Sequence, residues 1–299
     1  MRKAALHNLG CKVNAYETEA MEQLLEAAGY EIVSFEEKAD VYVINTCSVT
    51  NVADKKSRQM LHRAKAKNPD AVVVAAGCYV QAAADKLRED AAVDLIIGNN
   101  RKADLVPLLD AWFAGKAIKE SITDLAGSNE YEKLHINKQA EHTRAFIKVE
   151  DGCNRQCAYC VIPRARGPVR SRAESSILAE LRQLAAAGYR EVVLSAISLP
   201  SYGLDTGTNL VELVEKCAQV EGIERLRLGS LDPDMLTPEF ITRLAAVDKL
   251  CPQFHLSLQS GCTATLRRMR RVYSAEQYAQ VVDQIRAAYG SRPVSFTTD

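Results

Sequence analysis

The stretch Cys153-Asn154-Arg155-Gln156-Cys157-Ala158-Tyr159-Cys160 places three cysteines on one short loop, spaced four and then three residues apart. Three thiolates can hold three corners of a cubane iron–sulfur cluster and leave its fourth iron without a protein ligand. An open iron can bind a small molecule, whereas a structural zinc site needs four ligands, and no fourth Cys or His lies near in sequence. The spacing therefore favours a reactive cluster over a structural metal.

A repeating pattern of strands and helices surrounds this loop. Residues 144–150 are expected to form a strand that leads into it, and further strands are expected at 191–195, 224–230, 253–259 and 293–298. Helical patterns fall between them, at about 174–187, 210–220, 238–247 and 275–289. Five such β/α repeats predict an open barrel. Polar residues alternate with apolar ones along these strands, as in His255, Ser257 and Gln259. If helices cover the outside of the barrel, this alternation predicts a polar inner face; the alternative is a strand face exposed to solvent.

The first part of the chain predicts a second α/β unit. Apolar runs at 41–45, 71–76 and 93–97 are typical of buried parallel strands, and helical patterns are expected at about 21–28 and 54–67. We therefore expect a doubly wound parallel sheet, with the domain boundary near residue 140. Such sheets bind ligands beyond the carboxyl ends of their strands.

Three more cysteines each follow a predicted strand of this sheet. They occur in Gly10-Cys11, Thr46-Cys47 and Gly77-Cys78. Cysteines used only for packing should lie within strands or on apolar helix faces. Their recurrence at one edge predicts a second three-cysteine cluster, with free thiols in loops as the alternative.

Composition sets broad limits. The 299 residues include 38 basic and 38 acidic side chains, so net charge gives no argument for nucleic acid. Nine cysteines without an export signal or a long apolar segment favour a reducing cytoplasm and no membrane. Local basic runs remain candidates for RNA contact, with solvated surface as the alternative: Arg164, Arg166, Arg170 and Arg172, and then Arg267, Arg268, Arg270 and Arg271. Cys217, Cys251 and Cys262 are interpreted as structural thiols.

Taken together, these motifs resemble the methylthiotransferase family of radical S-adenosylmethionine (SAM) enzymes. The resemblance rests on Leu9–Asn14, Asn45–Cys47, Gly77-Cys78, the Cys153–Cys160 loop with its continuation to Arg172, and the segments Leu228–Pro233 and His255–Cys262. It covers nearly the whole chain and is strongest to the branch that modifies N6-threonylcarbamoyladenosine at tRNA position 37. An isopentenyladenosine tRNA or a ribosomal protein is the alternative substrate, and a non-catalytic metal-binding module is the alternative of another class.

The resemblance implies specific cofactors and partners. Cys153, Cys157 and Cys160 would hold a 4Fe–4S cluster that binds SAM, and Cys11, Cys47 and Cys78 would hold a second one that carries the sulfur species. The SAM-derived 5′-deoxyadenosyl radical would abstract hydrogen from C2 of the adenine. Expected SAM contacts are Tyr159, Ser195, Arg227, Ser257 and Gln259. Expected partners are the tRNA anticodon stem-loop and an electron donor such as flavodoxin or ferredoxin.

The implied domain organisation is residues 1–140 as the N-terminal methylthiotransferase domain and 141–299 as a radical SAM barrel that lacks its last strand. The C-terminal RNA-binding β-barrel domain of the family is expected to be absent.

Overall fold

The computed structural model describes residues 1–136 and 144–299 of the chain. They divide into two compact units, one of 1–136 with 161–168, the other of the remaining residues. The expected domain boundary near residue 140 lies outside the described residues.

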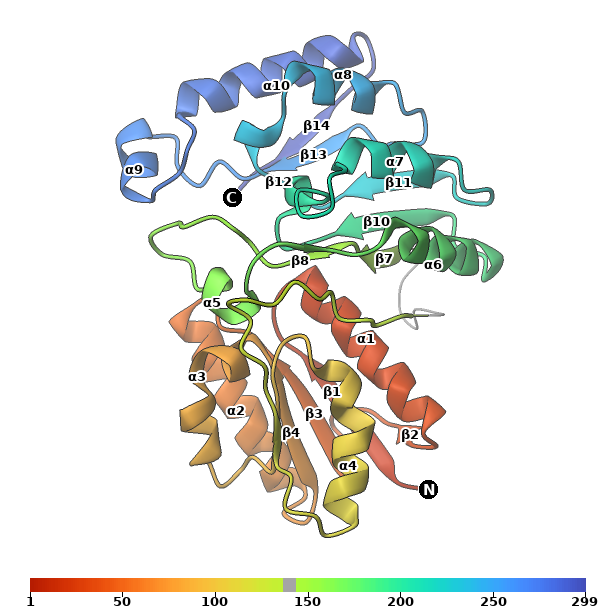
Figure 1. Cartoon of the computed structure of the whole chain (residues 1–299), viewed down its shortest axis with the longest axis vertical. Coiled ribbons are helices and arrows are strands. Elements are labelled where there is room, and N and C mark those ends of the chain that lie inside the picture. Colours follow the sequence, from red (N-terminus) through yellow and green to blue (C-terminus); the bar gives the residue numbers. More distant parts are fainter. Residues whose placement is uncertain (137–143) are drawn as a thin grey trace. The chain divides into compact units, whose positions relative to one another are not determined.

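The first unit is a doubly wound parallel sheet, as expected. Its six strands run in the order β2-β1-β3-β4-β5-β6, all parallel (Figure 1). The strands are β1 (Lys3–Asn8), β2 (Glu31–Ile32), β3 (Val41–Thr46), β4 (Val72–Gly77), β5 (Leu95–Ile97) and β6 (Glu120–Ser121). From β1 the chain adds β2 on one side of the sheet and then β3 on the other side. The switch point between β1 and β3 opens a crevice beyond the carboxyl ends of these strands.

Helices cover both faces of this sheet because β3 and β4 are apolar on both sides. Helices α2 (Asn51–Lys67) and α3 (Cys78–Arg88) pack on one face, and α1 (Lys12–Ala27) and α4 (Leu105–Phe113) on the other (Figure 1). Tyr42 and Ile44 of β3 belong to the first core, and Val41 and Val43 to the second. The sequence of β3 is therefore continuously apolar and does not alternate between apolar and polar residues. The short helix α5 (Ile162–Arg166) also belongs to this unit.

The second unit is an open arrangement of parallel strands covered by helices. Strands β7 (Ala145–Lys148), β10 (Glu191–Ser195) and β11 (Arg225–Leu228) form one sheet, and β12 (Ser230–Leu231), β13 (Gln253–Leu256) and β14 (Ser295–Thr297) form another. A bridge between Leu226 and Leu250 links them. A short antiparallel pair joins β8 (Glu150–Asp151) to β9 (Arg170–Ser171). Over the described residues the sheets do not close, which agrees with the expected partial barrel.

The helices of the second unit cover the apolar side of its strands. They are α6 (Glu174–Ala186), α7 (Leu210–Ala218), α8 (Pro238–Ala245), α9 (Thr263–Arg268) and α10 (Ala275–Tyr289). Leu194, Leu228 and Leu256 pack in one core with residues of α6, α7, α8 and α10. His255 and the other polar residues of the same parity lie outside that core, so the condition for a polar inner face, helices on the apolar side, is met. Short 3₁₀ turns, η1 (Lys102–Asp104), η2 (Leu199–Ser201) and η3 (Pro233–Met235), complete the elements.

Candidate metal centres

The N-terminal cysteines follow three adjacent strands of the first sheet. Cys11 is the N-cap of α1 after β1, Cys47 follows β3, and Cys78 is the first residue of α3 after β4. Thr46 pairs with Gly77 in the sheet, so Cys47 and Cys78 come directly after paired residues. The structure thus brings the three loops together at the switch point. Burial raises the pKa of the Cys11 and Cys47 thiols, so binding a metal there requires loss of their protons.

Two glycines at this rim have conformations that other residues rarely adopt. Gly10 has a φ of +111°, and a Cβ atom there would lie 3.1 Å from the Cys47 sulfur. Gly77 has a φ of +94°, and its Cβ would lie 2.4 Å from Asn45 Oδ1 and 2.7 Å from the Thr46 carbonyl oxygen. Glycine at both positions therefore lets the cysteine loops approach one another.

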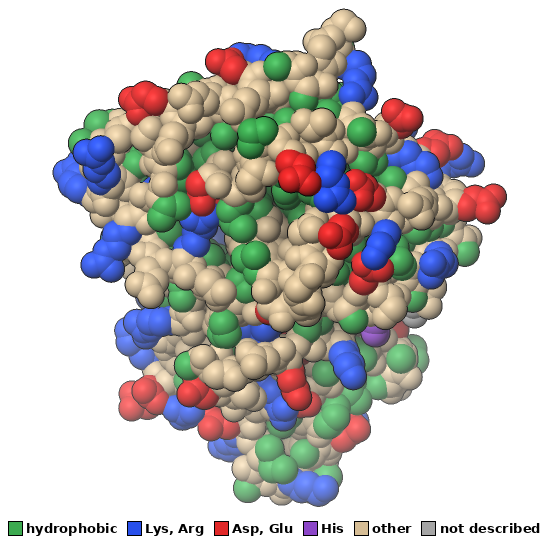
Figure 2. All heavy atoms as spheres, turned by 45° about the horizontal axis from the view of Figure 1, so that its top comes forward, with side chains coloured by type: hydrophobic (Ala, Val, Ile, Leu, Met, Phe, Trp, Pro, Cys, Tyr) green, Lys and Arg blue, Asp and Glu red, His purple; other side chains and the backbone are tan. Residues whose placement is uncertain are grey.

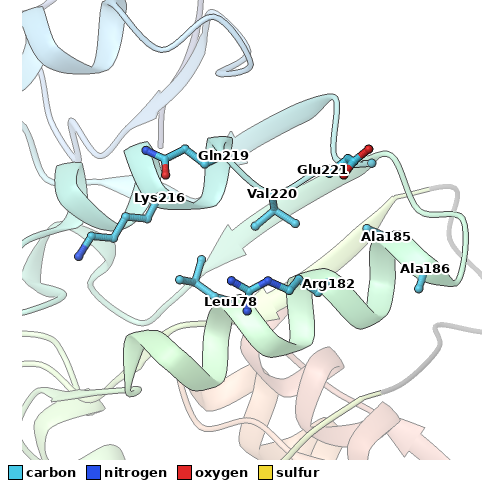
Figure 3. A pocket seen from close by; sticks show the side chains of 9 residues that line it. Leu178, Arg182, Ala185, Ala186, Lys216, Gln219, Val220 and Glu221 are labelled. Atoms are coloured by element: carbon cyan, nitrogen blue, oxygen red, sulfur yellow. The ribbon is translucent and has the colours of Figure 1, made fainter.

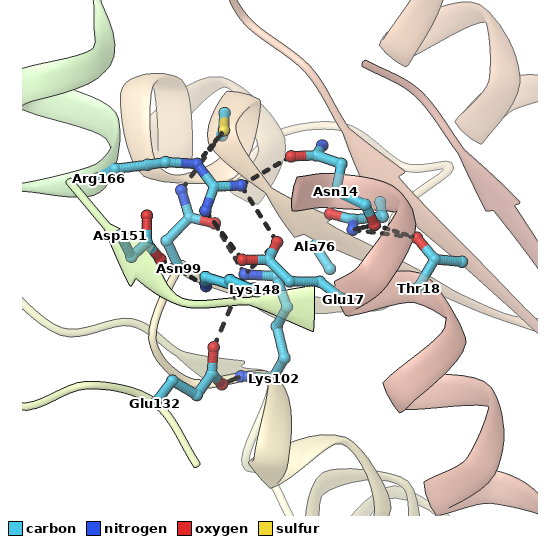
Figure 4. A network of polar contacts seen from close by, with 12 residues as sticks. Asn14, Glu17, Thr18, Ala76, Asn99, Lys102, Glu132, Lys148, Asp151 and Arg166 are labelled. Carbon is cyan, nitrogen blue, oxygen red and sulfur yellow. Dashed lines mark hydrogen bonds and ion pairs between the residues drawn. The ribbon is translucent and has the colours of Figure 1, made fainter. Parts of the chain in front are cut away.

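A buried ion network adjoins Cys78 (Figure 4). The Arg166 guanidinium donates to Cys78 Sγ at 3.3 Å and to Glu17 Oε1 at 2.8 Å. Lys102 Nζ lies 3.1 Å from Glu17 Oε2. The side chains of Arg166, Glu17 and Lys102 are fully buried. Sequence patterns did not indicate this network, because Arg166 and Glu17 are 149 positions apart.

The loop Cys153–Cys160, called the signature loop below, belongs to the second unit and follows β8. Cys160 N donates to the Cys157 carbonyl at 3.1 Å, and Arg155 N donates to Cys153 Sγ at 3.4 Å. Cys153 and Cys160 are near enough that each thiolate would repel the other. Burial raises the pKa of the Cys153 thiol to about 11, so loading a metal there requires loss of a proton.

Charged and aromatic side chains hold the signature loop. Arg155 forms an ion pair with Asp234 at 2.6 Å and approaches Asp232 at 3.7 Å. Arg271 donates to the Tyr159 hydroxyl at 2.8 Å and to Asp232 at 3.1 Å. Both ends of the loop are therefore tied to one acidic pair that follows β12.

The two cysteine sets suit a polynuclear metal centre better than a single metal ion. Across residues 1–136 and 144–299, no three His, Cys, Asp or Glu side chains gather closely enough to hold a single metal ion. A four-iron cluster binds each thiolate to a different iron atom, so its ligands need not surround one point. Three thiols on neighbouring loops fit that donor set and do not fit a mononuclear site.

The residues expected to contact SAM have different surroundings. Ser195 ends β10, is 2% exposed, and its Oγ has no hydrogen-bond partner among the described residues. The Tyr159 hydroxyl donates to Gln259 Oε1 at 2.9 Å, and Gln259 has a φ of +65°. Arg227 donates to Glu191 at 2.6 Å. Glu191 is the first residue of β10, so the Arg227 side chain is directed toward the amino end of the sheet. Ligands of such sheets usually bind at the opposite, carboxyl end of the strands.

Ser257 follows β13 and is half-buried, and its carbonyl oxygen accepts a hydrogen bond from the Tyr273 hydroxyl at 2.5 Å. Its place beyond the carboxyl end of a strand agrees with a ligand contact.

Burial corrects the interpretation of the first basic run. Arg166, Arg170 and Arg172 are each at most 3% exposed, so they are unavailable for phosphate contact at the surface. Arg172 forms a 2.5 Å ion pair with Glu180. Arg164 alone of that run is exposed.

The second basic run is only partly exposed. Arg267, Arg268 and Arg270 are exposed, whereas Arg271 is turned toward Tyr159 and Asp232. On the face shown in Figure 2, basic and acidic side chains are interspersed, as the zero net charge suggests.

A cavity of about 860 Å³ lies between α6 and α7 of the second unit (Figure 3). Its lining includes Leu178, Arg182, Lys216 and Val220 and no cysteine or expected SAM contact. Cys217 is fully buried in the apolar core nearby, as expected for a structural thiol, whereas Cys262 is exposed.

Family comparisons divide the chain similarly. Residues 3–98 match the family described as "Uncharacterized protein family UPF0004", and residues 147–298 match the Radical SAM superfamily. No helix of residues 1–136 and 144–299 combines the length and apolar character needed to cross a bilayer.

Several curated proteins are similar over nearly the whole chain. The threonylcarbamoyladenosine tRNA methylthiotransferase MtaB of Aquifex aeolicus is 40% identical over 98% of this chain and 71% of its own length. The MtaB protein of Bacillus subtilis is 39% identical over 96% of this chain and 64% of its own. A tRNA-2-methylthio-N(6)-dimethylallyladenosine synthase of Moorella thermoacetica is 35% identical over 97% and 66%. The chain spans about two thirds of the length of these relatives.

Solved structures share the fold at low identity. The radical SAM methyltransferase TsrM of Kitasatospora setae, solved with cobalamin and a [4Fe-4S] cluster, has a TM-score of 0.69 at 15% identity over 99% of this chain and 68% of that chain. The cobalamin-dependent radical SAM enzyme OxsB has a TM-score of 0.63 at 12% identity, over 100% and 49%. At these identities the likeness shows a shared fold and nothing about ligands or activity.

Proposed function

This chain belongs to the tRNA methylthiotransferase family of the radical SAM superfamily, and from that premise we propose that it adds a methylthio group to C2 of N6-threonylcarbamoyladenosine at position 37 of tRNA. Four relatives named for threonylcarbamoyladenosine tRNA are 33–40% identical to it. Four relatives named for dimethylallyladenosine are 33–35% identical to it, so that nucleoside is the second candidate.

Members of this superfamily use SAM and a 4Fe–4S cluster, which supply the one-electron chemistry that removes hydrogen from an unactivated C–H bond. We assign the cluster to Cys153, Cys157 and Cys160, because three thiols on one loop leave an iron open. The ion pairs of Arg155 and the hydrogen bond of Arg271 to Tyr159 hold that loop in place before the cluster binds. Such preorganisation lowers the entropy lost on binding.

The second cluster is assigned to Cys11, Cys47 and Cys78. The observation that carries this assignment is the convergence of three cysteine loops on adjacent strands, with Cys47 and Cys78 directly after the paired residues Thr46 and Gly77. Three thiols again leave one iron without a protein ligand, where a sulfur species can bind.

Among the proposed SAM contacts, Ser195 has the strongest support. Its buried Oγ lacks a partner among the described residues, and a buried hydroxyl normally finds one. Gln259 and Tyr159 form a hydrogen-bonded pair beside the signature loop, and the left-handed backbone of Gln259 is the kind of strain that occurs at binding sites. Ser257 is also proposed to contact SAM. Arg227 has the least support as a SAM contact, because its guanidinium already donates to Glu191.

We also propose that the tRNA anticodon stem-loop is the partner and that the exposed Arg164, Arg267, Arg268 and Arg270 contact its phosphates. A flavodoxin or ferredoxin as electron donor, and a location in the cytoplasm without membrane attachment, complete the proposal.

Matched cysteine variants test the two assignments separately. Cys157→Ala is expected to abolish SAM cleavage to 5′-deoxyadenosine and to keep the N-terminal cluster. Cys78→Ala is expected to keep SAM cleavage and to lose methylthiolation of tRNA. Persistent 5′-deoxyadenosine formation by Cys157→Ala would contradict the assignment of the radical-forming cluster.

Nucleoside analysis of tRNA from a deletion strain tests the substrate. Loss of the methylthio group from threonylcarbamoyladenosine is expected; its loss from isopentenyladenosine instead would favour the second candidate. Zinc in place of iron in the isolated protein would favour a non-catalytic metal-binding module.

A further inference from the structure

Arg166 is a buried arginine that joins the surroundings of the N-terminal cysteines. Its Nε donates to Cys78 Sγ at 3.3 Å, and its Nη2 donates to Asn14 Oδ1 at 2.7 Å. The same oxygen accepts a long hydrogen bond from Cys11 Sγ at 3.7 Å. One guanidinium therefore contacts the Cys78 sulfur directly and the Cys11 sulfur through a single amide.

Asn14 carries the connection to the third cysteine loop. Its Nδ2 donates to the Leu9 carbonyl at 2.8 Å and to the Thr46 carbonyl at 3.0 Å. Leu9 lies two residues before Cys11, and Thr46 lies directly before Cys47. Since Asn14 is 1% exposed, water does not compete for these bonds. Arg166 and Asn14 together tie all three cysteine loops to one another.

A second layer of charge fixes the orientation of Arg166. Both Glu17 oxygens accept from it, Oε1 at 2.8 Å and Oε2 at 3.1 Å, in the two-pronged geometry that suits a guanidinium. Lys102 in turn lies 3.1 Å from Glu17 Oε2 and donates to Asn99 Oδ1 at 2.8 Å. Asn99 Nδ2 approaches Cys78 Sγ at 3.6 Å. The network therefore directs two N–H groups at one sulfur.

We propose that Arg166 is a positioning residue for the N-terminal cluster, holding its three ligand loops in place and raising its reduction potential through a charged hydrogen bond to the Cys78 sulfur. The inference rests on the proposed second cluster. Hydrogen bonds to ligand sulfurs and nearby charge are among the means by which proteins set the potential of such clusters. A positive charge favours the reduced form, which carries one more electron.

The test isolates the N-terminal cluster in a chain with Cys153, Cys157 and Cys160 all changed to Ala. After anaerobic reconstitution, iron content is measured and the midpoint potential is determined by redox titration followed by electron paramagnetic resonance. Arg166→Met is expected to shift the potential to more negative values or to lose iron. Arg166→Lys, which keeps the charge, is expected to restore part of the potential. Arg63→Met removes an exposed arginine of the same unit, one that pairs with Glu36 at the surface, and should leave iron content and potential unchanged.

Each outcome decides between the two proposals. A folded Arg166→Met chain with full iron and an unchanged potential would overturn the role of Arg166 and leave the second cluster standing. A parent chain that binds no four-iron cluster would overturn the second cluster and this inference with it. If circular dichroism shows that Arg166→Met is unfolded, the test uses Arg166→Lys instead. A lysine cannot bond Asn14, Glu17 and Cys78 at the same time, so a potential below that of the parent chain, or a loss of iron, would support the proposal. Parent values of both quantities would refute it.

Discussion

Gly77→Ala perturbs the rim of the first sheet at the residue that precedes Cys78. Gly77 has φ +94° and ψ −156°, a region that only glycine adopts readily. The added Cβ would lie 2.4 Å from Asn45 Oδ1 and 2.7 Å from the Thr46 carbonyl oxygen. Neither atom can move freely, because Asn45 is fully buried and donates to the Asn14 carbonyl oxygen at 2.9 Å, and the Thr46 oxygen belongs to the backbone of β3.

The expected loss has two parts. Backbone strain of this kind costs about 1–3 kcal/mol. Overpacking a close contact adds about 1–3 kcal/mol. We therefore expect the free energy of unfolding to fall by about 2–6 kcal/mol, a large share of the usual stability of a domain.

Gly29→Ala is the matched control. Gly29 also has a positive φ, +85°, but nothing lies within 4 Å of a Cβ placed there. Its substitution should cost only the left-handed strain of about 1–2 kcal/mol. Urea denaturation of the iron-free chain, followed by circular dichroism, gives both values, and iron content after reconstitution should fall in Gly77→Ala alone. Equal losses in the two variants would refute the close approach of the cysteine loops.

Two further predictions concern the second unit. Burial raises the pKa of the Glu150 carboxyl well above its usual value, so its stabilising contribution is complete below the unfolded pKa and is lost as pH rises through the folded pKa. Glu150→Gln should therefore raise the melting temperature more at pH 8 than at pH 4.5. A larger rise at pH 4.5 would contradict the raised pKa of this buried carboxyl. Arg172→Met removes the buried guanidinium that pairs with Glu180 and should cost about 3–5 kcal/mol in urea denaturation; a loss below about 1 kcal/mol would show that the pair is hydrated.

Sequence patterns predicted the fold well where local chemistry decides it. The apolar runs at β3 and β4 and the strand β10 lie within a residue of their predicted bounds, and α10 begins and ends as predicted. Its start carries a reciprocal capping pair, Ser274 with Gln277, which is a strong local signal. Helix α3 was not predicted, because it begins at Cys78 directly after a strand, with Gly77 as a cap that offers no side chain.

The cysteine rim was also predictable, since strand ends of a parallel sheet meet at one edge. The contacts around it were not. Arg166 lies in a basic run that suggested surface, and its partners Glu17 and Asn14 are 149 and 152 positions away. Arg172 was misread for the same reason, because its burial depends on packing against α6. Charge in a sequence does not indicate which arginines face water.

We propose that two separate cysteine triads each hold a four-iron cluster. Iron content after anaerobic reconstitution tests it in three proteins: the wild-type chain and two triple variants, one lacking Cys11, Cys47 and Cys78 and the other lacking Cys153, Cys157 and Cys160. About eight irons are expected in the wild type and about four in each variant. A wild-type chain with about four irons, all lost with a single triad, would contradict it.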